Sequence, residues 1–369
     1  MKIKSIKEIK NLKGKTVLLR ADFNVPIEKG KVVDDFRIEK TIPTIKYLKQ
    51  KGAKIIIVSH AGEDGAQTLE PVAKVLNKYV KTFFVPQTMP KNLILRNGEV
   101  VLLENIRREA GEMKNDASFA KKLASLGDIY VNEAFPVSHR EHASIVGVPK
   151  YLPHYAGLQM MTEIEHLEKV SKNPKHPFLF ILGGAKFSTK MPLINKFLKT
   201  ADTVSITGAL ANDFLKASGF EVGKSLIDDG DFGIAKIVNN KKLLLPVDVV
   251  VSTGGVNKNV ADVKKSEKIV DIGTESVREI GMAIAKAKMV LWNGPTGNYE
   301  NGWDKGTIAL LKMLAKSKAE TIIGGGDTVA LISKLKMEKK FSFVSTGGGA
   351  TLEFLSKGTL PGIIALLIK

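Results

Sequence analysis

The stretch Thr321-Ile-Ile-Gly-Gly-Gly-Asp327 joins an apolar, β-branched run to a cluster of three glycines. Glycine has no Cβ, so backbone N–H groups approach an oxyanion closely, and a helix that begins just afterwards directs its positive dipole end at the same anion. Two further clusters, Gly183-Gly-Ala-Lys186 and Gly347-Gly-Gly-Ala350, also follow apolar runs. One cluster alone would equally suit a turn. Three of them at strand ends predict a nucleotide phosphate site.

Strand patterns alternate with amphipathic helix patterns along the whole chain. Such alternation is typical of a parallel sheet with crossover helices, and here it occurs twice. We therefore expect an α/β fold of two Rossmann-like parallel-sheet domains. The predicted strands are 16–19, 54–58, 100–103 and 128–131 in the first half, then 178–182, 203–206, 247–251, 289–292, 321–323 and 341–344.

The segment 153–177 is the predicted boundary, because one helical pattern there leads into a proline-punctuated stretch. We interpret it as a linker helix and a hinge. The expected organisation is an N-terminal domain at 1–153, a linker helix at 154–172 and a C-terminal domain at 173–352.

The 56 basic and 38 acidic residues give a formal net charge of +18, which raises the question of a nucleic-acid partner. The lysines are spread over the polar faces of helix patterns, with few aromatic residues between them, so a solvated basic surface is the better interpretation. We therefore do not expect nucleic acid as a partner.

The sequence contains no cysteine, which excludes disulfides, thiolate zinc sites and thiol nucleophiles. No apolar stretch approaches the roughly 18 residues of a membrane span, and the N-terminus lacks the apolar region of a signal peptide. We expect a cytoplasmic protein without a membrane partner.

Polar residues follow each predicted strand of the first half, where parallel sheets bind ligands. Arginines taken singly are usually ion-pair partners on the surface, but Arg37, Arg107 and Arg140 with two histidines at one sheet edge would form a forked cationic pocket. Such a pocket suits a carboxylate and a phosphate. The strings concerned are Arg20-Ala-Asp22-Phe-Asn24, Ser59-His60, Glu104-Asn-Ile-Arg107 and Ser138-His-Arg140.

At this point an ordered set of strings resembles the phosphoglycerate kinase family in order and spacing, from near the N-terminus to Leu366. Each string alone could arise by chance, but the ordered set is highly specific. The strings are Arg20-Ala-Asp-Phe-Asn-Val-Pro26, Asp35-Phe-Arg37, Ser59-His60, Leu103-Glu-Asn-Ile-Arg107, His139-Arg-Glu-His-Ala-Ser144, Gly183-Gly-Ala-Lys186, Trp292-Asn-Gly-Pro295, Gly324-Gly-Gly-Asp327 and Ser345-Thr-Gly-Gly-Gly-Ala-Thr-Leu-Glu353.

The resemblance implies which residues bind the two substrates. The N-terminal domain would bind 3-phosphoglycerate or 1,3-bisphosphoglycerate through Asp22, Asn24, Arg37, His60, Arg107 and Arg140. The C-terminal domain would bind ATP or ADP with Mg²⁺, Glu300 holding the ribose and Asp327 associated with the metal. The nucleotide positions are Gly183, Gly184, Lys186, Lys190, Gly208, Asn293, Glu300, Gly324, Gly325, Gly326, Asp327 and Thr328.

The resemblance also implies the reaction. It is the glycolytic and gluconeogenic transfer of a phosphoryl group between 1,3-bisphosphoglycerate and ADP, giving 3-phosphoglycerate and ATP, by a monomeric transferase that closes about a hinge. Arg37, Lys186 and Lys190 would surround the transferring group, with N–H donors from Gly348 and Gly349. The segment 353–369 would return to the N-terminal domain. Positioning and cations are what phosphoryl transfer mainly requires.

The sequence departs from the family at Glu63, where the family usually has arginine, and at Arg108, where it usually has phenylalanine. Glu63 either lines the pocket and opposes the anion or points to solvent, and Arg108 could send a replacement cation into the pocket. Two alternative functions stay open: a related carboxylate kinase with an altered acid substrate, and a basic nucleic-acid-binding protein on the same fold.

Overall fold

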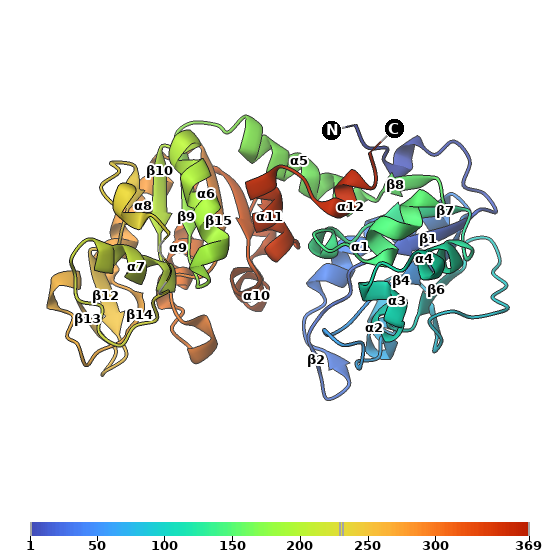
Figure 1. Ribbon diagram of the computed structural model, residues 1–369, viewed down its shortest axis with the longest axis horizontal. Coiled ribbons are helices and arrows are strands. Elements are labelled where there is room, and N and C mark those ends of the chain that lie inside the picture. The colour runs from blue at the N-terminus through green and yellow to red at the C-terminus, as the bar shows by residue number, and fades with distance from the viewer. Residues whose placement is uncertain (1, 229, 231, 368–369) are drawn as a thin grey trace. The chain divides into compact units, whose positions relative to one another are not determined.

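The computed structural model describes residues 2–228, 230 and 232–367, and it divides the chain into two compact units (Figure 1). The N-terminal unit comprises Met1–Glu165 together with Lys357–Lys369, and the C-terminal unit comprises His166–Ser356. The chain therefore returns to its first unit at the end. Within that unit the Gly362 N–H donates to the Ser138 carbonyl at 2.8 Å, and Ile3 forms a β-bridge with Leu367.

A six-stranded sheet forms the centre of the N-terminal unit, and all its neighbouring strands are parallel. The four predicted strands are present, whereas β5 and β8 were missed because three-residue edge strands show no periodicity. In spatial order the strands are β5 (Phe83–Val85), β6 (Val100–Leu103), β4 (Lys54–Val58), β1 (Thr16–Arg20), β7 (Ile129–Asn132) and β8 (His154–Ala156); a hairpin of β2 (Ile27–Glu28) and β3 (Lys31–Val32) lies outside the sheet.

The central strands are apolar over most of their length because helices cover the sheet. Val17, Leu19 and Ile57 are fully buried and belong to one core cluster with Ile38 and Ile45 of α1. The helices of the unit are α1 (Phe36–Gln50), α2 (Glu70–Tyr79), α3 (Ala110–Met113), α4 (Ala117–Ala124) and α12 (Pro361–Ile364).

A second six-stranded parallel sheet forms the centre of the C-terminal unit. Its strands in spatial order are β11 (Leu243–Leu244), β10 (Thr203–Ile206), β9 (Phe178–Leu182), β15 (Met289–Asn293), β16 (Glu320–Gly324) and β17 (Phe343–Val344). The helices are α6 (Phe187–Thr200), α7 (Ala209–Ala217), α8 (Thr274–Lys286), α9 (Lys305–Leu314), α10 (Gly326–Lys334) and α11 (Gly349–Lys357).

One predicted strand belongs to a different sheet. The run 247–251 contains β12 (Asp248–Val251), which pairs antiparallel with β13 (Val256–Asn259) and β14 (Ile269–Ile272) instead of joining the parallel sheet. Gly254 and Gly255 both have positive φ and reverse the chain directly after β12. So short a connection permits only antiparallel pairing, because a parallel return needs a crossover.

The predicted linker helix begins later than expected, because residues 154–156 form β8 and α5 extends over Leu158–Lys172. The buried carboxylate of Glu133, just after β7, accepts the N–H groups of Gln159 at 3.1 Å and Met160 at 3.0 Å. A Cβ on Gly157 would lie 2.0 Å from this carboxylate, so glycine is required there. The end of β7 thereby fixes the start of α5.

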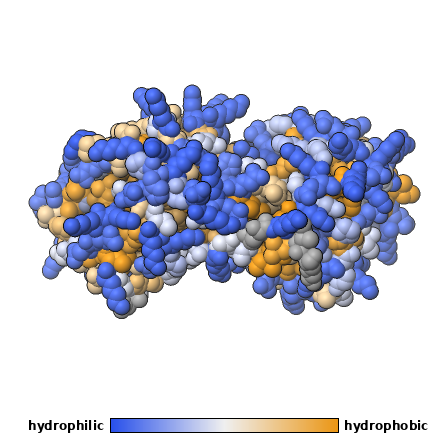
Figure 2. Space-filling model, turned by 90° about the horizontal axis from the view of Figure 1, so that it is seen from above, coloured by the Kyte–Doolittle hydropathy of each residue, from blue (hydrophilic) through white to orange (hydrophobic). Residues whose placement is uncertain are grey.

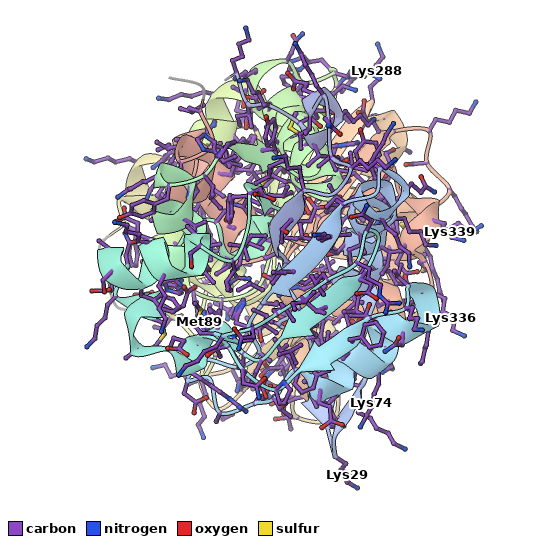
Figure 3. All side chains as sticks on the ribbon, turned by 90° about the vertical axis from the view of Figure 1, so that its right-hand side faces the viewer. Lys29, Lys74, Met89, Lys288, Lys336 and Lys339 are labelled. Atoms are coloured by element: carbon purple, nitrogen blue, oxygen red, sulfur yellow. The ribbon has the colours of Figure 1, made fainter. Side chains whose placement is uncertain are left out.

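The excess lysine lies on solvated surface. Hydrophilic side chains are spread over the visible face of the units, with hydrophobic ones between them (Figure 2). The lysines labelled in Figure 3 are exposed and point away from the ribbon: Lys29, Lys74, Lys288, Lys336 and Lys339. No helix in the described part of the chain has the length and apolarity that a membrane crossing requires.

Candidate active site

Five of the predicted substrate residues lie together at the carboxyl edge of the N-terminal sheet. Asp22 and Asn24 follow β1, His60 follows β4, Arg107 follows β6, and Arg37 is in the first turn of α1. The ends of parallel strands meet at one edge, which is why residues far apart in the sequence form one cluster.

Asp22 holds Arg37 in place. Arg37 Nη1 lies 3.4 Å from Asp22 Oδ1 and donates to the Asn24 carbonyl at 3.1 Å. The Asn24 side chain in turn accepts the Gly62 N–H at 3.0 Å, which ties the loop after β1 to the loop after β4. Burial raises the pKa of Asp22, but Arg37, His60 and the Asn24 N–H outweigh it, and the pKa lies below its ordinary value. Asp22 is therefore a carboxylate at neutral pH.

Arg107 is the most buried of the predicted substrate arginines, with 7% of its side chain exposed. Its Nη1 donates to the Gly62 carbonyl at 2.6 Å, while its buried Nε has no hydrogen-bond partner among the described residues. The Glu63 carboxylate is 92% exposed and also reaches to 3.4 Å from Nη1. Glu63 therefore faces solvent and still opposes a second anion at Arg107.

Arg108 does not supply the missing cation. Its Nη1 lies 3.0 Å from the buried Glu104 carboxylate, and its Nε donates to the Gly65 carbonyl at 3.2 Å. The suggestion that Arg108 enters the anion pocket is thus wrong, because Glu104 neutralises it outside the cluster.

Arg140 is the exposed member of the predicted set. Its side chain is exposed and forms no hydrogen bond or ion pair with a described residue, so no direct contact joins it to the other five. Its charge acts on His142: burial, together with the charges of Arg107, Arg20 and Arg140, lowers the pKa of that imidazole to about 4.

His60 is neutral at physiological pH. Burial lowers the pKa of its imidazole well below the ordinary value, Asp22 raises it, and Arg20, Arg107 and Arg37 lower it again. Arg20 was not among the predicted site residues, although it ends a buried strand; an arginine closing an apolar run was the available signal.

In the C-terminal unit each glycine cluster joins a strand to a helix, as predicted. Lys186 precedes α6 with a left-handed backbone, φ 64°, which is unusual for a residue other than glycine. Lys190, in the first turn of α6, is buried and donates to the Gly183 carbonyl. Burial, opposed by the charge of Asp327 and reinforced by that of Lys186, lowers the pKa of Lys190 to about 8. These three charges therefore lie near one another.

The glycines fall into two groups. A Cβ on Gly183 would lie 2.2 Å from the Pro295 carbonyl oxygen, and one on Gly208 would lie 2.5 Å from the Gly184 nitrogen. Close packing of the loops requires these glycines. By contrast, a Cβ on Gly326 or Gly349 would meet no atom within 4 Å, and neither has positive φ.

The N–H groups of these glycines divide in the same way. The Gly183, Gly184 and Gly208 N–H groups donate to the carbonyls of Asn293, Pro295 and Thr296 at 2.9, 2.9 and 3.0 Å. The first turns of α10, beginning at Gly326, and α11, beginning at Gly349, instead start with N–H groups that have no acceptor within the helix. Gly325 and Gly348, with positive φ, turn the chain into these helices.

A cavity of about 330 Å³ lies beside these turns, and four predicted nucleotide residues line it: Gly184, Gly208, Glu300 and Asp327. Asn212, Leu215 and Tyr299, which were not predicted, also line it. Asn293 Nδ2 and Thr328 Oγ1 do not line it; both atoms are buried without a hydrogen-bond partner in the described part of the chain. Gly324 packs against Asn293 at the end of β16.

The described side chains do not offer a complete set of ligands for a metal ion. Within residues 2–228, 230 and 232–367, no group of three or more His, Cys, Asp or Glu side chains could hold an ion. Asp327 alone fits the usual arrangement for Mg²⁺, which takes one or two carboxylates and completes its shell with phosphate oxygens and water.

The N-terminal unit thus has buried arginines at its strand ends, and the C-terminal unit has lysines and helix N-termini at its glycine turns; both arrangements suit anionic ligands. The family model for phosphoglycerate kinase matches residues 6–358. The phosphoglycerate kinases of Coprothermobacter proteolyticus and Pseudothermotoga lettingae are 40% and 42% identical, each over the full length of both chains.

Solved structures agree with these relatives. The phosphoglycerate kinase of Coxiella burnetii superposes with a TM-score of 0.86 at 36% identity over 99% of both chains. That of Pyrococcus horikoshii superposes with a TM-score of 0.88 at 30% identity, covering 99% of this chain and 98% of the other. The chain therefore belongs to the phosphoglycerate kinase family. The predicted family, fold class and enzyme class, a phosphotransferase with a carboxyl group as acceptor, are confirmed.

Proposed function

We propose that the cluster of Asp22, Asn24, Arg37, His60 and Arg107, together with the exposed Arg140, binds phosphoglycerate in the glycolytic phosphoryl transfer of this family. The observation that carries this assignment is Arg107: a buried guanidinium is held by the Gly62 carbonyl while its Nε has no described partner. A buried donor without a partner is costly, and an anionic oxygen would satisfy it.

The glycine turns of the C-terminal unit bind the nucleotide in this proposal. Gly326 and Gly349 lack a packing reason for being glycine, and both begin helices, where phosphate oxygens find N–H donors and a favourable dipole. Gly348 and Gly349 would thus donate to the transferring phosphoryl group, and Lys186 and Lys190 would neutralise the phosphates. Glu300 lines the cavity and would accept hydrogen bonds from the ribose hydroxyls.

The remaining glycines act indirectly. Gly183, Gly184 and Gly208 let the three loops pack closely, and Gly324 and Gly325 shape the entry to α10 beside Asn293. Thr328 and Asn293 hold buried polar atoms beside the turn into α10, outside the lining of the cavity. Mg²⁺ held by Asp327 and the phosphates would act as a Lewis acid and neutralise the charge that develops on the transferring phosphoryl group.

The residues assigned to phosphoglycerate and those assigned to the nucleotide do little covalent chemistry. The acceptor is already a carboxylate or a nucleotide phosphate, so no general base is required, and cations stabilise charge on the equatorial oxygens. Arg37 serves from the phosphoglycerate side, and Lys186 and Lys190 serve from the nucleotide side. Because one ligand is assigned to each unit, we infer that hinge closure brings them together and excludes water. The proposed enzyme acts as a monomer, and the glycolytic role supports a cytoplasmic location.

A coupled assay with 3-phosphoglycerate, ATP and Mg²⁺ tests the proposal. We expect turnover, and chelation of Mg²⁺ should abolish it. Arg107→Met should reduce turnover mainly by raising KM. Lys339→Met, a charge-matched change at an exposed lysine, should leave turnover unchanged. Turnover with other carboxylates but not 3-phosphoglycerate would instead support the altered-substrate alternative. Small-angle scattering should show compaction only with both substrates present, and identical profiles would refute closure.

A further inference from the structure

Arg20 is a buried cation to which no substrate contact has been assigned. It ends β1 with 1% of its surface exposed, beside the phosphoglycerate cluster. All three nitrogens of its guanidinium have partners: Nε donates to Ser144 Oγ at 2.7 Å, Nη1 donates to the Ala21 carbonyl, and Nη2 lies 3.2 Å from His60 Nδ1.

The contact with His60 determines where the imidazole carries its proton. Arginine has only donors, so His60 Nδ1 must be the acceptor, and the proton of the neutral ring is on Nε2. A proton on Nδ1 would confront a guanidinium N–H that cannot accept it. The charged groups acting on the ring are Asp22, Arg20, Arg107 and Arg37, and three of these four are cations that oppose a second proton.

Arg20 is itself held in one orientation. The Ser144 hydroxyl that accepts from Nε donates to Glu112 Oε1 at 2.6 Å, and the Ser144 N–H donates to Glu112 Oε2 at 2.9 Å. Glu112 and Ser144 are 0% and 1% exposed. The buried series Glu112, Ser144, Arg20 and His60 thus runs from α3 to the substrate cluster, and each member fixes the next.

We propose that Arg20 is a positioning residue, whose guanidinium holds His60 as the neutral Nε2–H tautomer and so presents the acidic substrate with an uncharged hydrogen-bond donor. This inference rests on the proposed assignment of His60 to the phosphoglycerate site. Without the guanidinium, Nδ1 is available for a proton, and the ring either changes tautomer or becomes an imidazolium beside Asp22. An imidazolium attracts the anionic substrate, so KM would then fall as the pH falls.

The tautomer of the intact enzyme is measured first. In protein carrying ¹⁵N-labelled histidine, long-range ¹H–¹⁵N correlation spectra distinguish Nδ1–H, Nε2–H and doubly protonated rings. The chain has 6 histidines, and the His60 signals are those missing in His60→Gln. We expect the Nε2–H form throughout about pH 5.5 to 8, the range in which an ordinary histidine titrates. An Nδ1–H ring or an imidazolium at pH 7 would overturn the proposal.

Arg20→Lys separates positioning from charge. Lysine keeps the positive charge but lacks the planar guanidinium that donates to Ser144, Ala21 and His60 at once. We expect KM for 3-phosphoglycerate to rise about fivefold to tenfold near neutral pH, the cost of a misplaced hydrogen bond to a charged group, with kcat changed less than about threefold. KM should also fall towards low pH, and the His60 signals should titrate. If His60 in Arg20→Lys kept its Nε2–H form and KM did not depend on pH, the positioning role of Arg20 would be refuted.

Two further variants complete the test. Arg108→Lys is the matched control, because its ion pair with Glu104 lies outside the series, and it should keep the parent pH profile. Ser144→Ala removes the acceptor of Arg20 Nε and should weaken the tautomer preference in the same direction, even if Arg20→Lys does not fold. An unchanged KM in His60→Gln would refute the substrate assignment of His60, while the spectra of the parent protein would still report on Arg20.

Discussion

Replacement of Glu63 by glutamine should strengthen phosphoglycerate binding. Its carboxylate Oε2 lies 3.4 Å from Nη1 of Arg107, the buried arginine assigned to the substrate. An incoming anion must share this guanidinium with Glu63. Glutamine keeps the shape and removes the charge, and the Gly62 carbonyl, 2.6 Å from Nη1, continues to orient the arginine.

The size of the effect follows from the exposure of Glu63. At this separation, Coulomb's law gives about 1 kcal/mol in water and several times more in a protein interior. The 92% exposed carboxylate is screened by solvent, so the upper part of the range for exposed pairs applies, about 0.5 to 1 kcal/mol, or a two- to fivefold change. We therefore expect KM for 3-phosphoglycerate to fall two- to fivefold with an unchanged kcat, because the contact affects ground state and transition state alike.

Steady-state kinetics at low and high salt measures this effect. The gain should shrink with added salt, since the Debye length falls to about 3 Å at 1 M. Asp64→Asn is the matched control: it removes the same charge from an adjacent residue whose carboxylate accepts the Ala66 N–H at 3.0 Å. An equal effect of both substitutions would refute the reasoning, because net charge alone would then explain it. A fall in KM beyond about tenfold would show that Glu63 lines the pocket.

Four other outcomes are expected. Lys186→Ala should lower kcat about a hundredfold or more without changing the melting temperature, as for loss of a transition-state donor, and a loss below tenfold would contradict its role. The kcat/KM for ATP should decline as the pH rises through about 8, where the free enzyme loses the Lys190 charge, and a decline that persists in Lys190→Arg would exclude this residue as its cause. Gly326→Ala should keep the melting temperature but raise KM for ATP, and an unaffected KM would refute phosphate contact at α10. Gly183→Ala should instead unfold at lower temperature, because its Cβ would lie 2.2 Å from the Pro295 carbonyl oxygen. Burial raises the pKa of Glu133 from 4.5 to about 7, equivalent to roughly 3 kcal/mol of pH-dependent stability that is present at low pH and lost as the pH rises through 7. Glu133→Gln should therefore gain stability relative to the parent as the pH rises from about 5 to 8. A difference in thermal unfolding that stays constant over this range would argue against it.

Local patterns in the sequence predicted much of the fold. Buried parallel strands are apolar over most of their length, so runs such as 54–58 and 178–182 were recognisable, and glycine clusters at strand ends indicated the turns into α6, α10 and α11. Run 247–251 showed the limit of this approach. Its residues suit any buried strand, and only the reversal at Gly254 and Gly255 decides that β12 pairs antiparallel.

The glycines show a similar limit at the nucleotide site. In the sequence, Gly183 and Gly326 are equivalent members of strand-end clusters. In the structure, Gly183 is required because a backbone carbonyl lies against it, whereas Gly326 faces open space. The distinction depends on Pro295, more than a hundred residues after Gly183 in the sequence.

By itself, the sequence determined the family, the two parallel sheets and the chemical character of the residues that follow each strand. These depend on composition and short-range spacing, which the chain carries locally. The tertiary structure alone decided that Glu63 reaches Arg107, that Glu104 neutralises Arg108, and that Arg20 meets His60 and Ser144. Arg20 and Ser144 are 124 residues apart in the sequence, and no periodicity encodes their contact. Such pairings arise because neighbouring strands bring their carboxyl ends to one edge, where burial makes each charged group depend on the partners around it.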